Sequence, residues 1–208
     1  MPRYALLALA LVVIELAPGR ALPDGGAVTL AGGPALTVLP LMTLPVDGSP
    51  TALVSTFGGV LELRYAPGNH LEIVATGFYD APARFAHVTL DGGGALVSRL
   101  TGEVTSWGAL LGVQYVSGLT WRFHIGGAIG WRHQGFAKVD GWSVSGGTVP
   151  ALHSGMDALV LSVVAGLEWQ VSDRLNVSVL PSLQFLVGGE GRVAIVVPVT
   201  LGYSWYLF

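Results

Sequence analysis

Charged side chains recur at alternate positions within apolar segments of this chain, and they are the residues best placed to do chemistry. Six of them fall on the face of their segment that is otherwise small or polar: Glu62, Arg64, Glu72, Arg122, Arg132 and Glu168. The planar fork of arginine binds carboxylates in bidentate fashion, and an unpaired buried charge costs on the order of several kcal/mol. The three acids and three arginines therefore predict a network of Arg–carboxylate pairs, with a gated path for protons or small ions as the alternative.

His124 falls on the same face as these charges. We expect it to be a buried histidine whose hydrogen bonds are satisfied, although a histidine in this setting could also titrate near neutral pH.

Hydrolytic chemistry would need a serine nucleophile, a histidine base and an acid that orients the base. His153 and Ser154 are adjacent in a predicted loop, and adjacent loop residues seldom hold a nucleophile and its base in line. The acids in predicted loops could bind divalent cations at a membrane surface, but scattered acids are more often solvated: Asp91, Asp140, Asp157 and Glu190. We therefore predict no catalytic residue, no cofactor and no metal site, so that the protein is not an enzyme.

The composition restricts the elements that can position the charged face. The chain has 208 residues, of which 51% are hydrophobic and 11% charged, against a usual charged share of about 25%. After the N-terminus no apolar run approaches the ~20 residues that a membrane-spanning helix needs. The chain contains no Cys, which removes disulfides and thiolate metal sites. A formal charge of −3 provides no basic face for nucleic acid.

Period-two alternation predicts eight strands, at residues 35–45, 51–65, 70–80, 104–116, 120–134, 158–171, 175–187 and 192–208. The first is the least regular, because Pro40 and Pro45 lack a donor for a sheet. In the others one face is apolar, and it carries aromatic residues near the strand ends: Trp107, Tyr115, Trp121, Trp131, Trp169 and Trp205. Apolar outward faces that end in an aromatic girdle are typical of transmembrane β-barrels.

The connections between the predicted strands alternate in length. The turns after the second, fourth and sixth strands are short, whereas the two long loops, 81–103 and 135–157, fall in the other set. Outer-membrane barrels have short periplasmic turns and longer external loops. The pattern predicts an all-β protein, an eight-stranded antiparallel up-and-down transmembrane barrel with both termini in the periplasm. A barrel of eight strands is just wide enough for its side chains to fill it.

The N-terminus has the features of a secretory signal peptide. Arg3 is followed by an apolar stretch from Tyr4 to Leu16, and Ala21 is a small residue suited to cleavage. We expect a signal peptide at 1–21, a periplasmic lead-in at 22–34 and the barrel at 35–208. An uncleaved membrane anchor is the alternative.

The last strand resembles the C-terminal signal of bacterial outer-membrane barrel proteins, in which a polar residue and a Gly precede hydrophobic residues at the end of the chain. The matching residues are Thr200, Gly202, Trp205 and Leu207, with Phe208 one residue beyond the motif. The resemblance implies that the barrel-assembly machinery recognises this segment.

The mature chain as a whole resembles small outer-membrane barrels of the OmpA/OmpX class. The resemblance implies a structural or surface-interaction role in the outer membrane of a Gram-negative bacterium. Its partners would be membrane lipid, lipopolysaccharide and a surface ligand that the sequence does not identify. Three other functions stay open: a porin-like channel or transporter for small solutes, a lipid-modifying enzyme, and a secreted soluble barrel that binds lipid.

Overall fold

The computed structural model describes residues 26–41, 53–68, 70–90, 94, 96–143, 155–187 and 192–207. These residues form nine strands: β1 Ala27–Pro40, β2 Leu53–Ala66, β3 Leu71–Leu90, β4 Leu96–Gly118, β5 Trp121–Ser143, β6 Gly155–Gln170, β7 Leu175–Val179, β8 Ser182–Val187 and β9 Arg192–Tyr206. In the described part of the chain no helix is long and apolar enough to cross a membrane. The predicted signal peptide lies outside the described residues.

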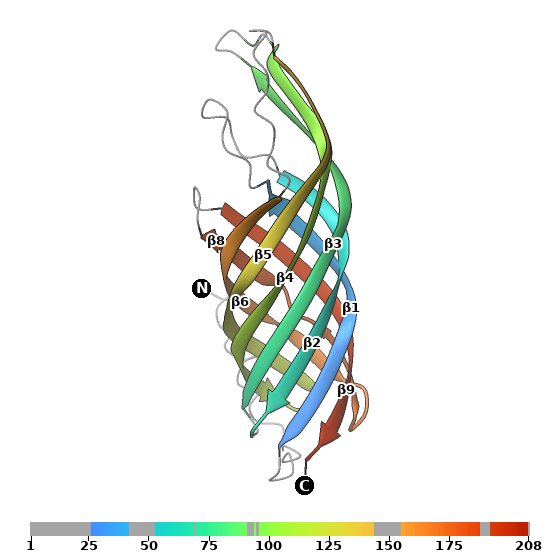
Figure 1. Cartoon of the computed structure of the whole chain (residues 1–208). Helices are drawn as coiled ribbons and strands as arrows, with labels where there is room; N and C mark the ends of the chain where they lie inside the picture. The colour runs from blue at the N-terminus through green and yellow to red at the C-terminus, as the bar shows by residue number, and fades with distance from the viewer. Residues whose placement is uncertain are drawn as a thin grey trace, which may run out of the picture.

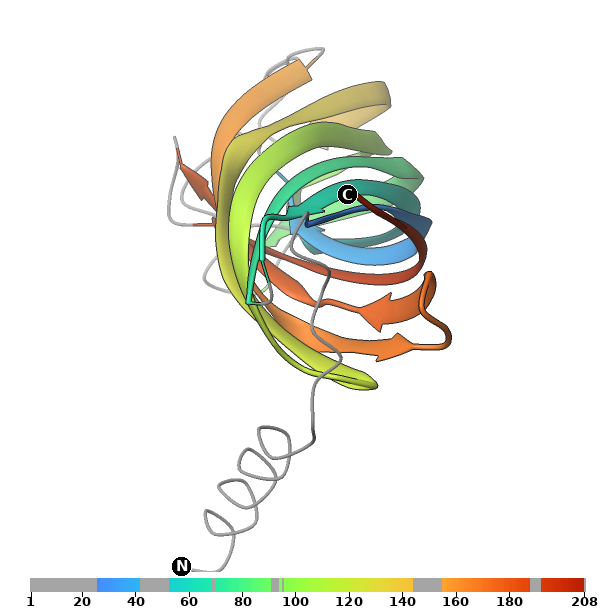
Figure 2. The ribbon, with the colours of Figure 1, turned by 90° about the horizontal axis from the view of Figure 1, so that it is seen from below.

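The strands form one antiparallel sheet that closes into a barrel (Figures 1 and 2). Each strand from β1 to β6 pairs with the next, and β9 pairs with β1 to close the ring. Both β7 and β8 lie between β6 and β9, so together they occupy one position in the wall. The ring therefore has the eight wall positions that the sequence predicts, and the antiparallel barrel is confirmed.

The predicted seventh strand is interrupted at Leu180 and Pro181, which gives the separate strands β7 and β8. Pro181 cannot donate a backbone hydrogen bond, but its carbonyl oxygen still accepts one from the Ala165 nitrogen at 3.1 Å. The wall therefore stays continuous across the interruption.

The first strand begins earlier than the sequence predicts. Residues 27–34, expected in a periplasmic lead-in, belong to β1, where Ala27 pairs with Ala66 of β2 and with Tyr206 of β9. Glycine and proline in the middle of β1 obscured its alternation. At Gly33 an added Cβ would overlap the carbonyl oxygen of Val199, so the close approach of β1 and β9 requires a glycine.

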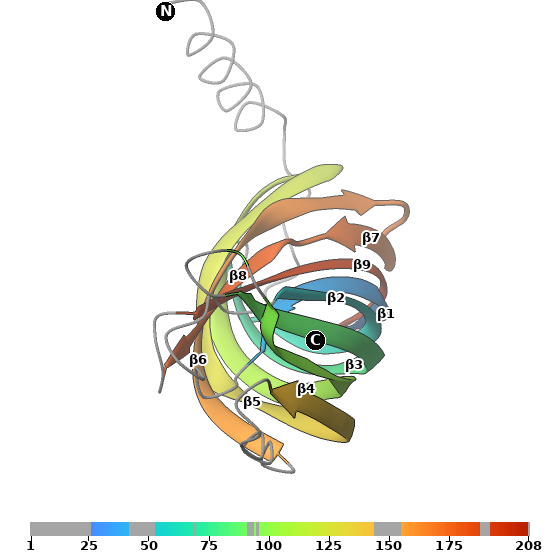
Figure 3. The same ribbon diagram turned by 90° about the horizontal axis from the view of Figure 1, so that it is seen from above.

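The two long loops are shorter than predicted, because strands occupy much of 81–103 and 135–157. β3 continues to Leu90 and β4 starts at Leu96, whereas β5 continues to Ser143. Register shifts after Asp80 and near Glu103 put the alternation out of phase, which explains why the pattern failed there. Residues 81–90, 96–105 and 136–143 form a three-stranded extension that projects beyond β2 and β6 (Figures 1 and 3).

The barrel is apolar on the outside and polar on the inside. Phe57 on β2 is 73% exposed and Leu201 on β9 is 60% exposed. The largest fully buried side chains include Arg64, Arg132 and His124. A soluble domain shows the reverse distribution, and apolar residues on the outer face are what a barrel in lipid presents to the acyl chains.

Candidate functional site

Five of the six predicted lumen charges meet in one buried network, which we call the lower network: Glu62, Arg64, Glu72, Arg122 and Glu168. Glu62 and Arg64 both point inward because they are two residues apart on β2. The Arg64 Nε donates to Glu62 Oε2 at 2.8 Å, and its Nη1 donates to Glu168 Oε2 at 2.7 Å. Arg64 is only 1% exposed, so both bonds are shielded from water.

Glu168 of β6 joins the two arginines of the lower network. Its other oxygen, Oε1, accepts a hydrogen bond from Arg122 Nη1 at 2.9 Å. Arg122 Nη2 donates to Glu72 Oε1 at 3.0 Å. The charges therefore alternate in a chain, Glu62–Arg64–Glu168–Arg122–Glu72, in which each guanidinium contacts two carboxylates.

His124 lies fully buried beside the lower network. Its Nδ1 is 3.1 Å from Gln114 Oε1, while its Nε2 lies 3.6 Å from Glu168 Oε2 without a hydrogen-bond partner in the described part of the chain. The histidine is therefore buried as predicted, and one of its two ring nitrogens has a hydrogen-bond partner among the described residues.

Arg132 belongs to a separate group, which we call the upper network, toward the end of the barrel that carries the extension. Its Nη1 donates to Asp80 Oδ2 at 2.9 Å and to Ser106 Oγ at 3.0 Å, and its Nη2 donates to Gln184 Oε1 at 3.0 Å. The guanidinium carbon lies 4.4 Å from the centroid of the Phe78 ring. The upper network therefore connects β3, β4, β5 and β8 across the lumen.

Asp80 is the lumen acid that sequence reasoning missed. It is 2% exposed and also accepts a hydrogen bond from Thr37 Oγ1 at 2.7 Å. Its position has the inward parity of Glu72 and Phe78, but Asp80 stands next to a register shift and was placed at the strand end. The described lumen also contains a fourth arginine, Arg192 at the start of β9, which donates to a backbone carbonyl oxygen inside the barrel. The described lumen therefore holds four acids and four arginines.

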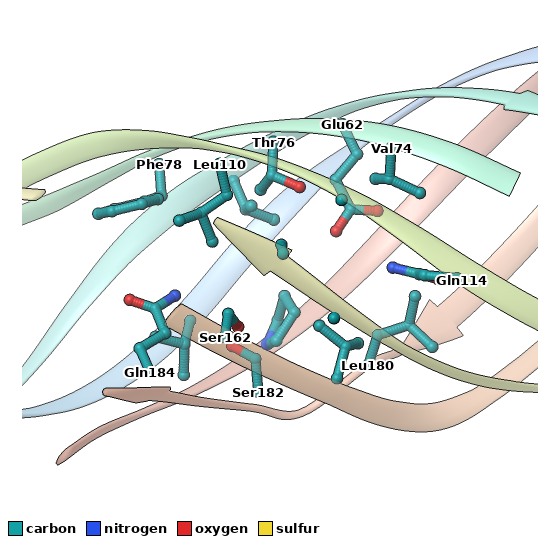
Figure 4. Close-up of a pocket in the computed structure, with 17 residues that line it drawn as sticks. Glu62, Val74, Thr76, Phe78, Leu110, Gln114, Ser162, Leu180, Ser182 and Gln184 are labelled. Carbon is teal, nitrogen blue, oxygen red and sulfur yellow. The ribbon is translucent and has the colours of Figure 1, made fainter. Parts of the chain in front are cut away.

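A cavity of about 40 Å³ separates the two networks. Figure 4 shows Glu62, Thr76 and Phe78 along one wall and Ser162, Ser182 and Gln184 along the other. The volume suits one or two water molecules and is too small for an organic solute. Ser162 Oγ, buried against this cavity, has no hydrogen-bond partner among the described residues, so a water molecule there would satisfy it.

An apolar cluster covers the upper network at the end of the lumen that carries the extension. Leu41, Val54, Phe85 and Val104 pack together, each at most 5% exposed. The ring of Phe136 meets that of Phe85 edge-on, with centroids 6.1 Å apart. The lumen therefore contains, in series, the lower network, a small cavity, the upper network and an apolar cluster.

The six predicted girdle residues all lie on the outer face, and they divide between the two ends of the barrel. Trp107 and Trp131 lie toward the extension, with ring centroids 4.5 Å apart. Tyr115, Trp121, Trp169 and Trp205 lie at the end with the short turns. There Trp121 and Trp169 stack with centroids 5.9 Å apart. The placement is compatible with two aromatic belts.

The residues of the C-terminal motif lie on both faces of β9. Thr200 is 2% exposed and shares a hydrogen bond of 2.6 Å with Ser178, and Gly202 also faces inward, against Asn176. Trp205 and Leu207 face outward, 47% and 43% exposed, and Phe208 lies outside the described residues. Recognition of this strand by the assembly machinery stays a prediction.

The loop residues considered for hydrolysis or cation binding fall mainly outside the described part of the chain: Asp91, His153, Ser154 and Glu190. Asp157 is described and lies on the outer face of β6. Within the described residues no group of three or more His, Cys, Asp or Glu side chains could hold a metal ion.

A closed antiparallel ring that is apolar outside and charged inside defines the fold of the small outer-membrane β-barrels. Among solved structures, the protein is similar to the outer membrane protein OprG from Pseudomonas aeruginosa, with a TM-score of 0.57 and 14% identity over 89% of this chain and 98% of that one. It is also similar to Ail, the attachment invasion locus protein of Yersinia pestis, with a TM-score of 0.51 and 15% identity over 86% of this chain and 99% of that one.

No family model matches the sequence, and no curated protein matches it. At 14–15% identity the structural similarity establishes the fold alone.

Proposed function

We propose that the protein is an outer-membrane barrel with a structural or surface-interaction role and a lumen that is closed to solutes. The filling of the lumen is the observation that carries this proposal. Arg64, Arg132 and Glu168 are each at most 1% exposed, and the cavity between the networks is only about 40 Å³. Other molecules would contact a barrel of this kind at its outer surface and its extension, and would not pass through its lumen.

The distribution of turns supports a periplasmic position for both ends of the barrel sequence. β2 and β3, β4 and β5, and β6 and β7 are joined by short turns at the end where β1 begins and β9 ends. The extension lies at the opposite end (Figure 1). Because short turns face the periplasm in outer-membrane barrels, we infer that the extension faces the cell exterior, where lipopolysaccharide and surface ligands are met.

A channel for small solutes is the second candidate, and the cavity between the networks, which is lined by both apolar and polar side chains, favours it. Passage would require the apolar cluster around Phe85 and the Arg132–Asp80 pair to move apart. The distances within the upper network, 2.9–3.0 Å, support the closed form as the resting state.

Conductance across a planar lipid bilayer tests the closed lumen. We expect no ion conductance from the wild-type barrel, and none from the double variant Arg132→Gly, Phe85→Ala, in which the lower network still fills the lumen. Measurable steps are expected once Arg64→Gly is added to these two substitutions. Phe57→Ala removes an outward-facing aromatic ring and is the matched control, expected to stay closed. Steady conductance of the wild type would contradict the proposal and favour the channel. Migration of boiled and unboiled samples on a gel would verify that each variant is folded.

A further inference from the structure

The outer face of the barrel carries a polar and aromatic cluster at the base of the extension. We call it the outer cluster: Trp107 on β4, Trp131 and His133 on β5, and Asp157 on β6. Trp131 Nε1 donates to Asp157 Oδ1 at 2.8 Å, and His133 Nδ1 lies 2.9 Å from the same oxygen. The His133 ring lies 5.6 Å from the Trp107 ring and 6.2 Å from the Trp131 ring. Two aromatic rings thus contact one carboxylate, and the Trp107 ring packs against both of them.

The outer cluster is held in a fixed arrangement. Trp107 and Trp131 meet edge-to-face at 84°, a geometry that aromatic pairs favour. The His133 ring lies so close to the Gly155 backbone that a Cβ at that position would overlap its Cε1 and Nε2 atoms. Because both donors reach Oδ1, Oδ2 of Asp157 remains available, and this side chain is 63% exposed.

The aromatic pairs at the periplasmic end have a different kind of polar partner from the aromatic rings of the outer cluster. Trp121 and Trp169 stack on each other, and Tyr203 packs against Trp205. The polar group that meets them is a cation, since Arg174 Nη1 donates to the hydroxyl of Tyr203 at 3.1 Å. At the outer cluster, by contrast, the group that meets the tryptophan is the carboxylate of Asp157.

The height of the outer cluster relative to the membrane follows from the strand register. Trp131 pairs with Leu159, and the next pair outward is His133 with Asp157. Asp157 therefore lies just beyond Trp131, whose aromatic ring marks the boundary of the apolar band. This places Asp157 at the level of the lipid headgroups. An exposed carboxylate at this level calls for a ligand with hydroxyl or amide donors.

Cationic side chains lie farther out on the same face of β3, β4 and β5. Glu103 pairs in register with Arg84, and Lys138 Nζ donates to Glu103 Oε1 at 2.9 Å. Glu103 lies four residues beyond Trp107 along β4, or about 13 Å at ~3.3 Å per residue. Arg84 and Lys138 carry two positive charges and Glu103 carries one negative charge. The net charge of this group is therefore positive, which suits a phosphate ligand.

We propose that the outer cluster binds the headgroup of a phosphorylated glycolipid in the outer leaflet, such as lipopolysaccharide. A sugar ring would lay its C–H face against Trp107, which is 48% exposed and perpendicular to Trp131, and a hydroxyl would donate to Asp157 Oδ2. Phosphate groups would lie toward Arg84 and Lys138, because Asp157 repels phosphate beside the rings. The inference rests on the proposed position of the extension outside the cell.

Binding of short-core lipopolysaccharide to the folded barrel in detergent micelles tests the proposal. The number of bound glycolipids per barrel would be followed by native mass spectrometry during a titration. We expect Asp157→Asn and Trp107→Ala each to raise the dissociation constant about tenfold, equivalent to ~1.4 kcal/mol. Trp169→Ala, the matched control at the opposite end, should stay within about twofold of the wild type.

Three results would overturn the glycolipid site: equal binding by wild type and both outer variants, an equal loss in the Trp169→Ala control, or phosphatidylglycerol binding as tightly as lipopolysaccharide. Gel migration would verify that every variant is folded.

A separate labelling experiment distinguishes this failure from failure of the proposed orientation. Because the chain has no Cys, Arg99→Cys on the extension provides a unique thiol. Labelling of intact cells by an impermeant maleimide would support the outward-facing extension, whatever the glycolipid result. If the thiol is labelled in lysed cells but not in intact cells, the proposed orientation is refuted, and the glycolipid site with it.

Discussion

Replacing Arg64 by methionine should strongly destabilise the barrel, because this side chain neutralises two buried acids. Arg64 donates to Glu62, Glu168 and, at 3.1 Å, Ser178. Without it, Glu168 keeps its bond to Arg122 at 2.9 Å, but Glu62 loses the only cation that contacts it in the described structure. Removing one member of a buried ion pair costs about 3–5 kcal/mol, and we expect Arg64→Met to lower the free energy of unfolding by this amount.

Urea-induced unfolding in lipid vesicles, followed by tryptophan fluorescence, measures the loss. Two further variants separate the charge from the packing. Glu62→Gln combined with Arg64→Met removes the unpaired charge and should recover more than half of the loss. Arg64→Lys retains the charge without the planar fork that reaches both acids, so it should be intermediate.

Arg174→Met is the matched surface control. Arg174 lies in an exposed turn and contacts Tyr203, and we expect no measurable change in stability. A loss below about 1 kcal/mol for Arg64→Met, against the larger cost expected for a buried pair, would refute the reasoning. So would a double variant as unstable as the single one, because the penalty would then not come from Glu62.

Two further predictions concern packing and titration. Gly130→Ala should destabilise the barrel by about 1–3 kcal/mol, because its Cβ would overlap the backbone of Ala109, whereas Gly77→Ala meets no atom within 4 Å and should be neutral in the same unfolding assay. The hydrogen bond from His133 lowers the pKa of the exposed Asp157 carboxyl below its ordinary value. The small stability that it adds is present above the unfolded-state pKa and is lost as the pH falls through the folded-state pKa. In His133→Phe, an NMR titration should find the carboxyl midpoint raised toward its ordinary value; an unchanged midpoint would assign the shift to another group.

The alternation of side chains in the sequence determined which residues face the lumen. Glu62 and Arg64, or Arg122 and His124, share a face whatever the tertiary structure, because successive side chains of a strand point to opposite sides. The same rule placed Trp107 and Trp131 outside. The membrane-barrel class and the closed, charged interior could therefore be predicted without coordinates.

Alternation failed where a strand departs from regular geometry. The register shift after Asp80 concealed both the inward position of that acid and the continuation of β3 to Leu90. Gly32, Gly33 and Pro34 concealed the first half of β1, and Pro181 divides a wall position into β7 and β8. Bulges, glycines and prolines change the local backbone without leaving a period-two signal.

Only the tertiary structure decided which charges meet. The sequence supplied a set of inward acids and arginines, but their heights in the lumen depend on the stagger between strands and on closure of β9 against β1. That stagger brings Glu168 between Arg64 and Arg122 and separates Arg132, which binds Asp80 instead. It also assembles Trp131, His133 and Asp157 on the outer face. A pattern within one strand fixes the side of the wall on which a residue lies, whereas its neighbours across the barrel follow from the register of all eight wall positions together.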